Sequence, residues 1–203
     1  MNYFVTAIGT DSGKTLVSAI LCTTFQADYW KPVQAGFPAD SETVRRLLDN
    51  ADVNIHKETY FFKTSASPHA AAALENIKIR LDDFVIPAHT KDLIIEGAGG
   101  CLVPLNDSDF VIDLAQKFKA EVILVSNLYL GSINHTLLTW EALQQRNLTV
   151  KGIIFNGIPN TESERIILHH TGLPCLLHIH QEEVVDKGVV EKYSKKLMQH
   201  WHG

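Results

Sequence analysis

The sequence predicts an α/β fold in which a mostly parallel β-sheet carries helices on both faces. Strand-like and helix-like segments alternate along all 203 residues, which is typical of strand–helix–strand connections. The strand-like segments are continuous apolar runs rather than alternations of apolar and polar residues, which indicates strands buried on both faces. Because a chain of this length matches one α/β domain, we expect residues 1–203 to form a single domain.

The expected strands are short apolar runs rich in β-branched and aromatic residues. In chain order they are residues 2–8, 28–34, 60–62, 92–96, 121–126, 150–156 and 174–179. The expected helices have apolar residues at helical spacing or, in one case, consecutive alanines. In chain order they are residues 14–25, a helix from Asp40 or Ser41 to Leu48, and then 69–75, 109–118, 134–146, 161–170 and 189–200. We expect a loop over the rest of residues 50–68 and a frayed tail at 200–202.

Composition and charge exclude several classes of protein. Lys and Arg total 18 against 23 Asp and Glu, a net charge of −5 that disfavours a nucleic-acid partner. No apolar run approaches the ~18 residues of a membrane span, and no secretory signal precedes the first strand, so we expect a cytoplasmic protein with no membrane partner.

The cysteines are too few for a disulfide framework. Cys22, Cys101 and Cys175 are expected to be buried free thiols. The ten histidines are expected to lie at the surface or in hydrogen bonds rather than on a metal.

Ligands of parallel sheets bind beyond the carboxyl ends of the strands, and residue types that carry chemistry gather there in this sequence. The first strand is followed by a small-residue loop that ends in Gly13, Lys14 and Thr15 at the start of a helix. Backbone N–H groups of such a loop bind phosphate, the Lys reaches the terminal phosphates, and the Thr hydroxyl binds Mg²⁺. Only three residues separate Gly9 from Gly13, where the usual motif has four, so an ordinary glycine turn is the alternative. The expected phosphate-binding residues are Gly9, Thr10, Asp11, Ser12, Gly13, Lys14 and Thr15.

Two carboxylates and a second lysine follow other strands. Mg²⁺ prefers a few oxygen ligands together with phosphates and water, and Thr15, Asp40 and Glu96 supply such a set. A carboxylate that ends an apolar strand, as Glu96 does, is costly to bury without a cation; Asp40 has the alternative of capping a helix. Lys31 lies within an apolar strand and needs an anionic partner there, unless its stem passes Trp30 to reach solvent.

Residues 5–15 resemble the phosphate loop of the dethiobiotin synthetase family, which reads Val-Thr-Gly-Thr-Asp-Thr-(Glu/Asp)-Val-Gly-Lys-Thr. The two align without a gap, so Thr10 falls on the family's loop Thr and Asp11 on its acidic residue, whereas Ala7 replaces its first Gly. The family loop is one residue longer than the common P-loop, and its first Gly falls on Ala7 rather than on Gly9. The three-residue spacing between Gly9 and Gly13 is therefore compatible with a phosphate loop.

Further segments carry the same resemblance in the same order. Residues 31–36 resemble the family's Lys-Pro-Val-x-(Ser/Thr)-Gly, with Ala35 in place of the hydroxyl residue. The remaining matches are Asp40, Ser67 with the following Pro-His, 96–100, 130–139 and Asn156. The resemblance covers residues 2–158; in the last strand this chain has residues 176–180 where the family has a Gly and a Pro.

The resemblance implies an ATP- and Mg²⁺-dependent enzyme of P-loop fold that closes a cyclic urea. The family's substrates are 7,8-diaminopelargonic acid and CO₂: one amine forms a carbamate, the carbamate takes the γ-phosphate of ATP, and the second amine expels phosphate to give dethiobiotin. It implies catalytic roles for Lys31, Lys14, Thr10 and Asp11, the last contacting either a substrate amine or the metal shell. Glu96, Gly99 and Asn156 would complete the nucleotide site. Lys31, Ala35, Ser67, Gly131, Ser132, Ile133 and Asn134 would bind the substrate, the last four at a helix N-terminus from the other subunit of a homodimer.

Two other classes of protein are alternatives to this one. A regulatory ATPase switch, such as a partitioning or septum-positioning protein, usually has an additional Lys early in the loop, where this chain has Ala7, Ile8 and Gly9. An amidating ligase would need a second, glutamine-splitting domain and a nucleophilic Cys. The sequence favours the synthetase over both.

Overall fold

The structure is a computed structural model that describes residues 1–48 and 52–201. Within these residues, a seven-stranded sheet has the order β4-β2-β6-β1-β7-β8-β9, and every neighbouring pair is parallel. A second, two-stranded parallel sheet pairs β3 with β5. The strands are β1 (Asn2–Ala7), β2 (Asp28–Trp30), β3 (Val33–Ala35), β4 (Ile55–His56), β5 (Tyr60–Phe62), β6 (Leu93–Glu96), β7 (Glu121–Asn127), β8 (Val150–Asn156) and β9 (Cys175–Ile179).

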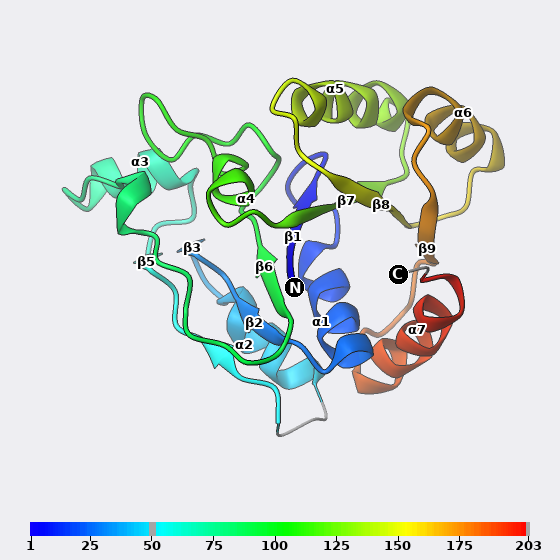
Figure 1. Ribbon diagram of the computed structural model, residues 1–203, viewed down its shortest axis with the longest axis horizontal. Helices are drawn as coiled ribbons and strands as arrows, with labels where there is room; N and C mark the ends of the chain where they lie inside the picture. The colour runs from blue at the N-terminus through cyan, green and yellow to red at the C-terminus, as the bar shows by residue number, and fades with distance from the viewer. Residues whose placement is uncertain (49–51, 202–203) are drawn as a thin grey trace.

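Helices cover both faces of the large sheet, as Figure 1 shows. They are α1 (Lys14–Phe25), α2 (Asp40–Leu47), α3 (Pro68–Leu74), α4 (Asp113–Lys117), α5 (Ser132–Gln144), α6 (Thr161–Thr171) and α7 (Lys187–His200), with a short 3₁₀ helix at Leu81–Asp83. Alternate residues of each strand point to opposite faces, so Val5 packs with α1, α2 and α7, whereas Phe4 packs with α3 to α6. The predicted α/β fold with a parallel sheet is therefore confirmed. None of the helices described is long and apolar enough to span a membrane.

The predicted strand over residues 28–34 is wrong in one respect that matters for the site. It breaks after Trp30, and its second half is β3, in the small sheet. Pro32 has no N–H to continue a sheet ladder, and its carbonyl instead accepts hydrogen bonds from the N–H groups of Thr59 and Tyr60. The break leaves Lys31 at the carboxyl end of β2 rather than within a strand.

Other boundaries differ for local reasons. The helix predicted over 109–118 is shorter, because Phe110 forms an antiparallel bridge with Pro104 and α4 begins only at Asp113. The two-residue strand β4 was not predicted. Asp40 is the first residue of α2, with Ala39 at the cap position and no side-chain cap, so the capping alternative for Asp40 is wrong.

The two ends of the chain meet at one edge of the core. Trp201 packs against Phe25 with ring centroids 4.7 Å apart and against Tyr3 at 5.6 Å. The prediction of a frayed tail is therefore wrong for Trp201, while His202 lies outside the described residues. The described cysteines are free, but Cys175 is exposed at the start of β9, so the expectation of burial is wrong for that thiol.

Candidate active site

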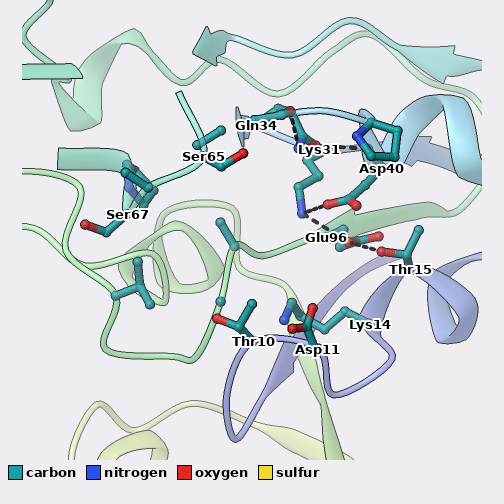
Figure 2. Close-up of a pocket in the computed structure, with 18 of the residues that line it drawn as sticks. Thr10, Asp11, Lys14, Thr15, Lys31, Gln34, Asp40, Ser65, Ser67 and Glu96 are labelled. Atoms are coloured by element: carbon teal, nitrogen blue, oxygen red, sulfur yellow. Dashed lines mark hydrogen bonds and ion pairs between the residues drawn. The ribbon is translucent and has the colours of Figure 1, made fainter. Parts of the chain in front are cut away.

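A cavity of about 720 Å³ opens at the carboxyl ends of β1, β2 and β6 (Figure 2). Most of the residues singled out from the sequence line it. They are Thr10, Asp11, Gly13, Lys14, Thr15, Lys31, Ala35, Asp40, Ser67, Glu96 and Gly99. Gln34, which lies within the segment 31–36 but had no role of its own assigned from the sequence, lines the same cavity, and so does Ser65, which the sequence did not single out. The segments that carry the prediction, up to 89 residues apart in the chain from Thr10 to Gly99, thus form one site.

The phosphate loop joins β1 to α1. Asp11 and Gly13 both have left-handed backbone angles, with φ of 57° and 95°, and α1 begins with no side-chain cap on its first N–H groups. Free N–H groups at a helix N-terminus attract anions. Inside the loop, the Lys14 ammonium and the Ser12 hydroxyl each donate to the Gly9 carbonyl at 3.1 Å. Gly9 and Ser12 therefore shape the loop without lining the cavity.

Asn156, at the end of β8, contacts the phosphate loop and holds it in place. Its side-chain amide donates to the Ser12 carbonyl at 2.9 Å. A Cβ on Gly13 would lie 2.4 Å from the same amide nitrogen, so only glycine fits between the loop and Asn156. This contact was not foreseen from the sequence; the adenine contact implied by the family resemblance stays a prediction.

Glu96, Lys31, Asp40 and Thr15 form one connected cluster, drawn with dashed lines in Figure 2. The Lys31 ammonium lies 2.5 Å from Asp40 Oδ2 and 3.0 Å from Glu96 Oε1, and it also donates to the Gly97 carbonyl at 3.0 Å. The Thr15 hydroxyl donates to the same Glu96 oxygen at 3.0 Å. Lys31 is buried, so the alternative in which its stem passes Trp30 to reach solvent is wrong.

Gln34 holds the Asp40 end of this cluster in place. Its side-chain oxygen accepts a hydrogen bond from the Asp40 N–H at 3.0 Å, and its side-chain nitrogen donates to the Gly36 carbonyl at 3.2 Å. The loop after β3 is thereby tied to the start of α2. Gln34 directly precedes Ala35 in the segment that resembles the family, so its place in the sequence indicated that it lies near the site.

The two lysines of the site differ in their proton affinity. Burial, with the positive charge of Lys31 next, lowers the pKa of Lys14 to about 8. Burial also acts to lower the pKa of Lys31, but the charges and hydrogen bonds of Glu96 and Asp40 together outweigh it, and the net direction is upward. Lys31 therefore stays cationic over the whole neutral range, whereas Lys14 loses its proton as the pH rises through its pKa of about 8.

The donor set around Lys31 fits a magnesium ion. Two carboxylates and a hydroxyl are the hard oxygen ligands that Mg²⁺ takes when phosphates complete its shell, and here a cationic ammonium already lies between the two carboxylates. Among residues 1–48 and 52–201, no group of three or more His, Cys, Asp or Glu gathers as a metal site without phosphate. The residues present therefore suit a cation that a bound phosphate helps to hold.

Gly131, Ser132, Ile133 and Asn134 do not line this cavity. Gly131 has φ of 105° and precedes α5, which begins at Ser132 with no side-chain cap. The neighbouring apolar residues Tyr129, Leu130 and Leu138 are exposed. Within one chain, the segment expected to bind the substrate carboxylate thus lies outside this cavity.

The densest group of histidines lies apart from the cavity. His169 and His170 are exposed on α6. His178 lies 3.3 Å from both a Glu164 oxygen and the Gly157 carbonyl, and its ring stacks on His180 with centroids 4.9 Å apart. Their placement agrees with surface or hydrogen-bonded roles.

Comparison with known proteins agrees with this geometry. The model of the AAA domain family matches residues 1–188. Among solved structures, a ParA family ATPase from Chlorobium tepidum is similar with a TM-score of 0.52 at 12% identity, covering 98% of this chain and 92% of that one. The septum site-determining protein MinD from Pyrococcus horikoshii has a TM-score of 0.51 at 16% identity, covering 99% and 90%. These likenesses show the fold alone.

Sequence relatives are more specific. The ATP-dependent dethiobiotin synthetase BioD of Cytophaga hutchinsonii is 60% identical over 202 residues, 98% of each chain. The chain belongs to the dethiobiotin synthetase family. The synthetase of the same name from Christiangramia forsetii is 45% identical and covers 97% of this chain and 95% of its own. Membership in the dethiobiotin synthetase family confirms the family resemblance predicted from the sequence, and it favours an ATP-dependent ligase over the regulatory switch.

Proposed function

We propose that this protein converts 7,8-diaminopelargonic acid, CO₂ and ATP into dethiobiotin, ADP and phosphate, as a step of biotin biosynthesis in the cytoplasm. The observation that carries the proposal is the cluster of Lys31, Asp40, Glu96 and Thr15 beside a phosphate loop, in a chain 60% identical to a synthetase of that name. The reaction needs phosphate positioning, neutralisation of charge on the γ-phosphate and a place for a carbamate. Each requirement has residues to meet it in one cavity.

The phosphate loop and α1 would hold the triphosphate. The Lys14 ammonium, which donates to the Gly9 carbonyl, would turn to the terminal phosphates when these are bound. Thr15, Asp40 and Glu96 would hold Mg²⁺, which would supply positive charge to the triphosphate. Thr10 lines the loop on the side that faces the cavity.

Lys31 would bind and orient the carbamate. In the family's reaction a substrate amine adds to CO₂, and a carbamate oxygen then attacks the γ-phosphorus and displaces ADP. The second amine attacks the carbamate carbon, and the C–O bond to phosphate breaks as the urea ring closes. Both negatively charged reactants meet beside the Lys31 ammonium, which offsets their repulsion.

The apolar wall of the cavity suits the hydrocarbon chain of the diamine. Ala35, Pro38, Ala66 and Val103 line it, with Ser67 as a polar neighbour. The substrate's carboxylate would lie at the N-terminus of α5, whose free N–H groups and partial positive charge attract anions. Because that segment does not line the cavity of its own chain, we propose a homodimer in which each subunit completes the site of the other.

A dependence test separates this function from the regulatory alternative. The protein is incubated with Mg²⁺-ATP and bicarbonate, with and without the diamine, and phosphate release is measured. We expect release to require the diamine and dethiobiotin to appear in equal amount. Release that needs DNA or lipid instead would assign the switch function.

Mixing two inactive variants tests the shared site. Lys31→Ala removes the ammonium from one half-site, and Asn134→Asp adds a negative charge where the substrate carboxylate would bind. Random reassociation puts one intact site in half of the dimers, so we expect the mixture to recover about one quarter of the wild-type activity. Sedimentation velocity should show a dimer. A mixture that stays inactive although mixed dimers form would contradict the sharing of sites.

Nucleotide affinity is expected to depend on pH through Lys14. The pKa of this lysine is lowered to about 8, mainly by burial, so the ammonium is present below that pH and is lost above it. We expect the Kd for ADP, measured by calorimetry from pH 6.5 to about 9.5, to rise as the pH passes through about 8. Lys14→Arg, which stays charged, is the control; an equally steep rise in that variant would assign the dependence to another group.

A further inference from the structure

Glu96 is wholly buried and yet accepts hydrogen bonds on both of its carboxylate oxygens. Thr15 and Lys31, which line the cavity, donate to Oε1. The other oxygen, Oε2, accepts a hydrogen bond from the Tyr29 hydroxyl at 2.9 Å. The first two donors belong to the nucleotide and metal site already described, whereas Tyr29 does not line the cavity.

The fold fixes Tyr29 in this role. Tyr29 lies on β2, next to β6 in the sheet, where it is in register with Ile94, two residues before Glu96. Its ring is fully buried in the core between the sheet and helices α1, α2 and α7. A rigid strand and a packed core hold the ring, so the hydroxyl has one place to point. At neutral pH an ordinary phenol, with a pKa of about 10, is a hydrogen-bond donor to a carboxylate.

A glutamate has three rotatable bonds, and the orientation of its carboxylate decides which lone pairs face a cation. With Oε2 bound by Tyr29, the carboxylate plane is fixed and Oε1 stays directed at Thr15. Without that donor, a buried carboxylate oxygen would have no partner, and the carboxylate would turn toward Lys31 and Thr15 to share their hydrogens. Loss of a residue that hydrogen-bonds a metal ligand typically lowers the affinity for the metal by about 10- to 100-fold.

We propose that Tyr29 is a positioning residue that orients Glu96 for binding the nucleotide-associated metal ion. This inference rests on the proposed function, because it takes Glu96 as a metal ligand. Tyr29 acts only through Glu96 and touches neither the cavity nor the substrate. An aromatic residue in an apolar strand predicts core packing and nothing else, so no sequence signal reveals this role.

The test compares Tyr29→Phe with Tyr3→Phe. Both changes remove one hydroxyl from a buried ring of the same core cluster, but the Tyr3 hydroxyl donates to the Met1 sulfur, at 3.4 Å, and not to a residue of the site. Binding of Mn²⁺ in the presence of ADP is measured by electron paramagnetic resonance. We expect Mn²⁺ to bind Tyr29→Phe about 10-fold or more weakly than wild type, and Tyr3→Phe like wild type. The KM for Mg²⁺ should rise in parallel, and saturating Mg²⁺ should restore most of kcat.

The outcomes separate this inference from the function on which it rests. ADP alone, which needs the phosphate loop but no metal, should bind Tyr29→Phe with wild-type affinity. Loss of ADP binding in Tyr29→Phe would show a structural role and overturn the inference. An unchanged Mn²⁺ affinity of this variant together with a lowered melting temperature would overturn it as well. If the wild-type protein with ADP binds no Mn²⁺, the metal site and the inference fall together, whereas diamine-dependent phosphate release still tests the reaction.

Discussion

Replacing Lys31 by Ala is expected to lower kcat for dethiobiotin formation by at least about 10³-fold, the size of effect seen when a charge that stabilises phosphoryl transfer is removed. The ammonium lies within 3.0 Å of both carboxylates of the candidate metal site, at the point where the γ-phosphate and the carbamate would meet. Without it, two anionic reactants meet beside two anionic side chains. The rate is measured as phosphate release at saturating ATP, Mg²⁺ and diamine.

Lys31→Ala should also lower the stability of the fold. Measuring that stability shows whether the activity is lost because the protein unfolds or because the ammonium is missing from the site. Removing one partner of a buried ion pair typically costs about 3–5 kcal/mol, and here it leaves Glu96, which is wholly buried, beside Asp40 with no ammonium. We expect a lower melting temperature without metal and a larger gain from Mg²⁺-ADP than in wild type, because the ion replaces the lost charge. Lys63→Ala, at an exposed lysine, is the control for charge alone. Near-normal turnover in Lys31→Ala would refute the catalytic role.

The sequence predicted the sheet well because burial on both faces leaves an unmistakable pattern of continuous apolar runs. The order of residues along the chain also identified the phosphate loop, since a strand, a small-residue loop and a helix follow one another locally. By contrast, residues 28–34 read as one uninterrupted strand, although the chain leaves the large sheet after Trp30. That break places Lys31 at the edge of the cavity, so the sequence identified the right residue within the wrong element.

Two hydrogen bonds between distant segments could not be predicted from the sequence. The hydrogen bonds from Tyr29 to Glu96 and from Asn156 to the Ser12 carbonyl depend on which strands are neighbours and in which register. Neither is encoded by local propensity or by spacing along the chain. The same holds for Trp201, whose position in the core depends on Tyr3 and Phe25, at the opposite end of the sequence.

Replacing Gly13 by Ala is expected to disrupt nucleotide binding more than any other single methyl addition in the loop. Gly13 has φ of 95°, where a side chain adds strain of about 1–3 kcal/mol, and the new Cβ would lie 2.4 Å from the Asn156 amide nitrogen. Either the loop or Asn156 must move by a large fraction of an ångström. A displacement of about 1 Å at a phosphate-binding loop can cost about 100-fold in kcat/KM, and we expect a loss of that order with a matching loss of ADP affinity in calorimetry.

Gly172→Ala is the matched control, because it separates backbone strain from the clash. Gly172 also has a left-handed backbone, with φ of 66°, but an added Cβ would meet nothing within 4 Å, and the residue caps α6 rather than α1. Its substitution should cost about 1–2 kcal/mol of stability and leave ADP affinity and kcat/KM unchanged. If the two variants lose stability equally and Gly13→Ala still binds ADP normally, the fit between Gly13 and Asn156 does not govern the loop. If Asn156→Ala restores ADP binding to Gly13→Ala although it also removes the hydrogen bond to the Ser12 carbonyl, the clash is the cause of the loss, because the double variant keeps the backbone strain and lacks the obstructing amide.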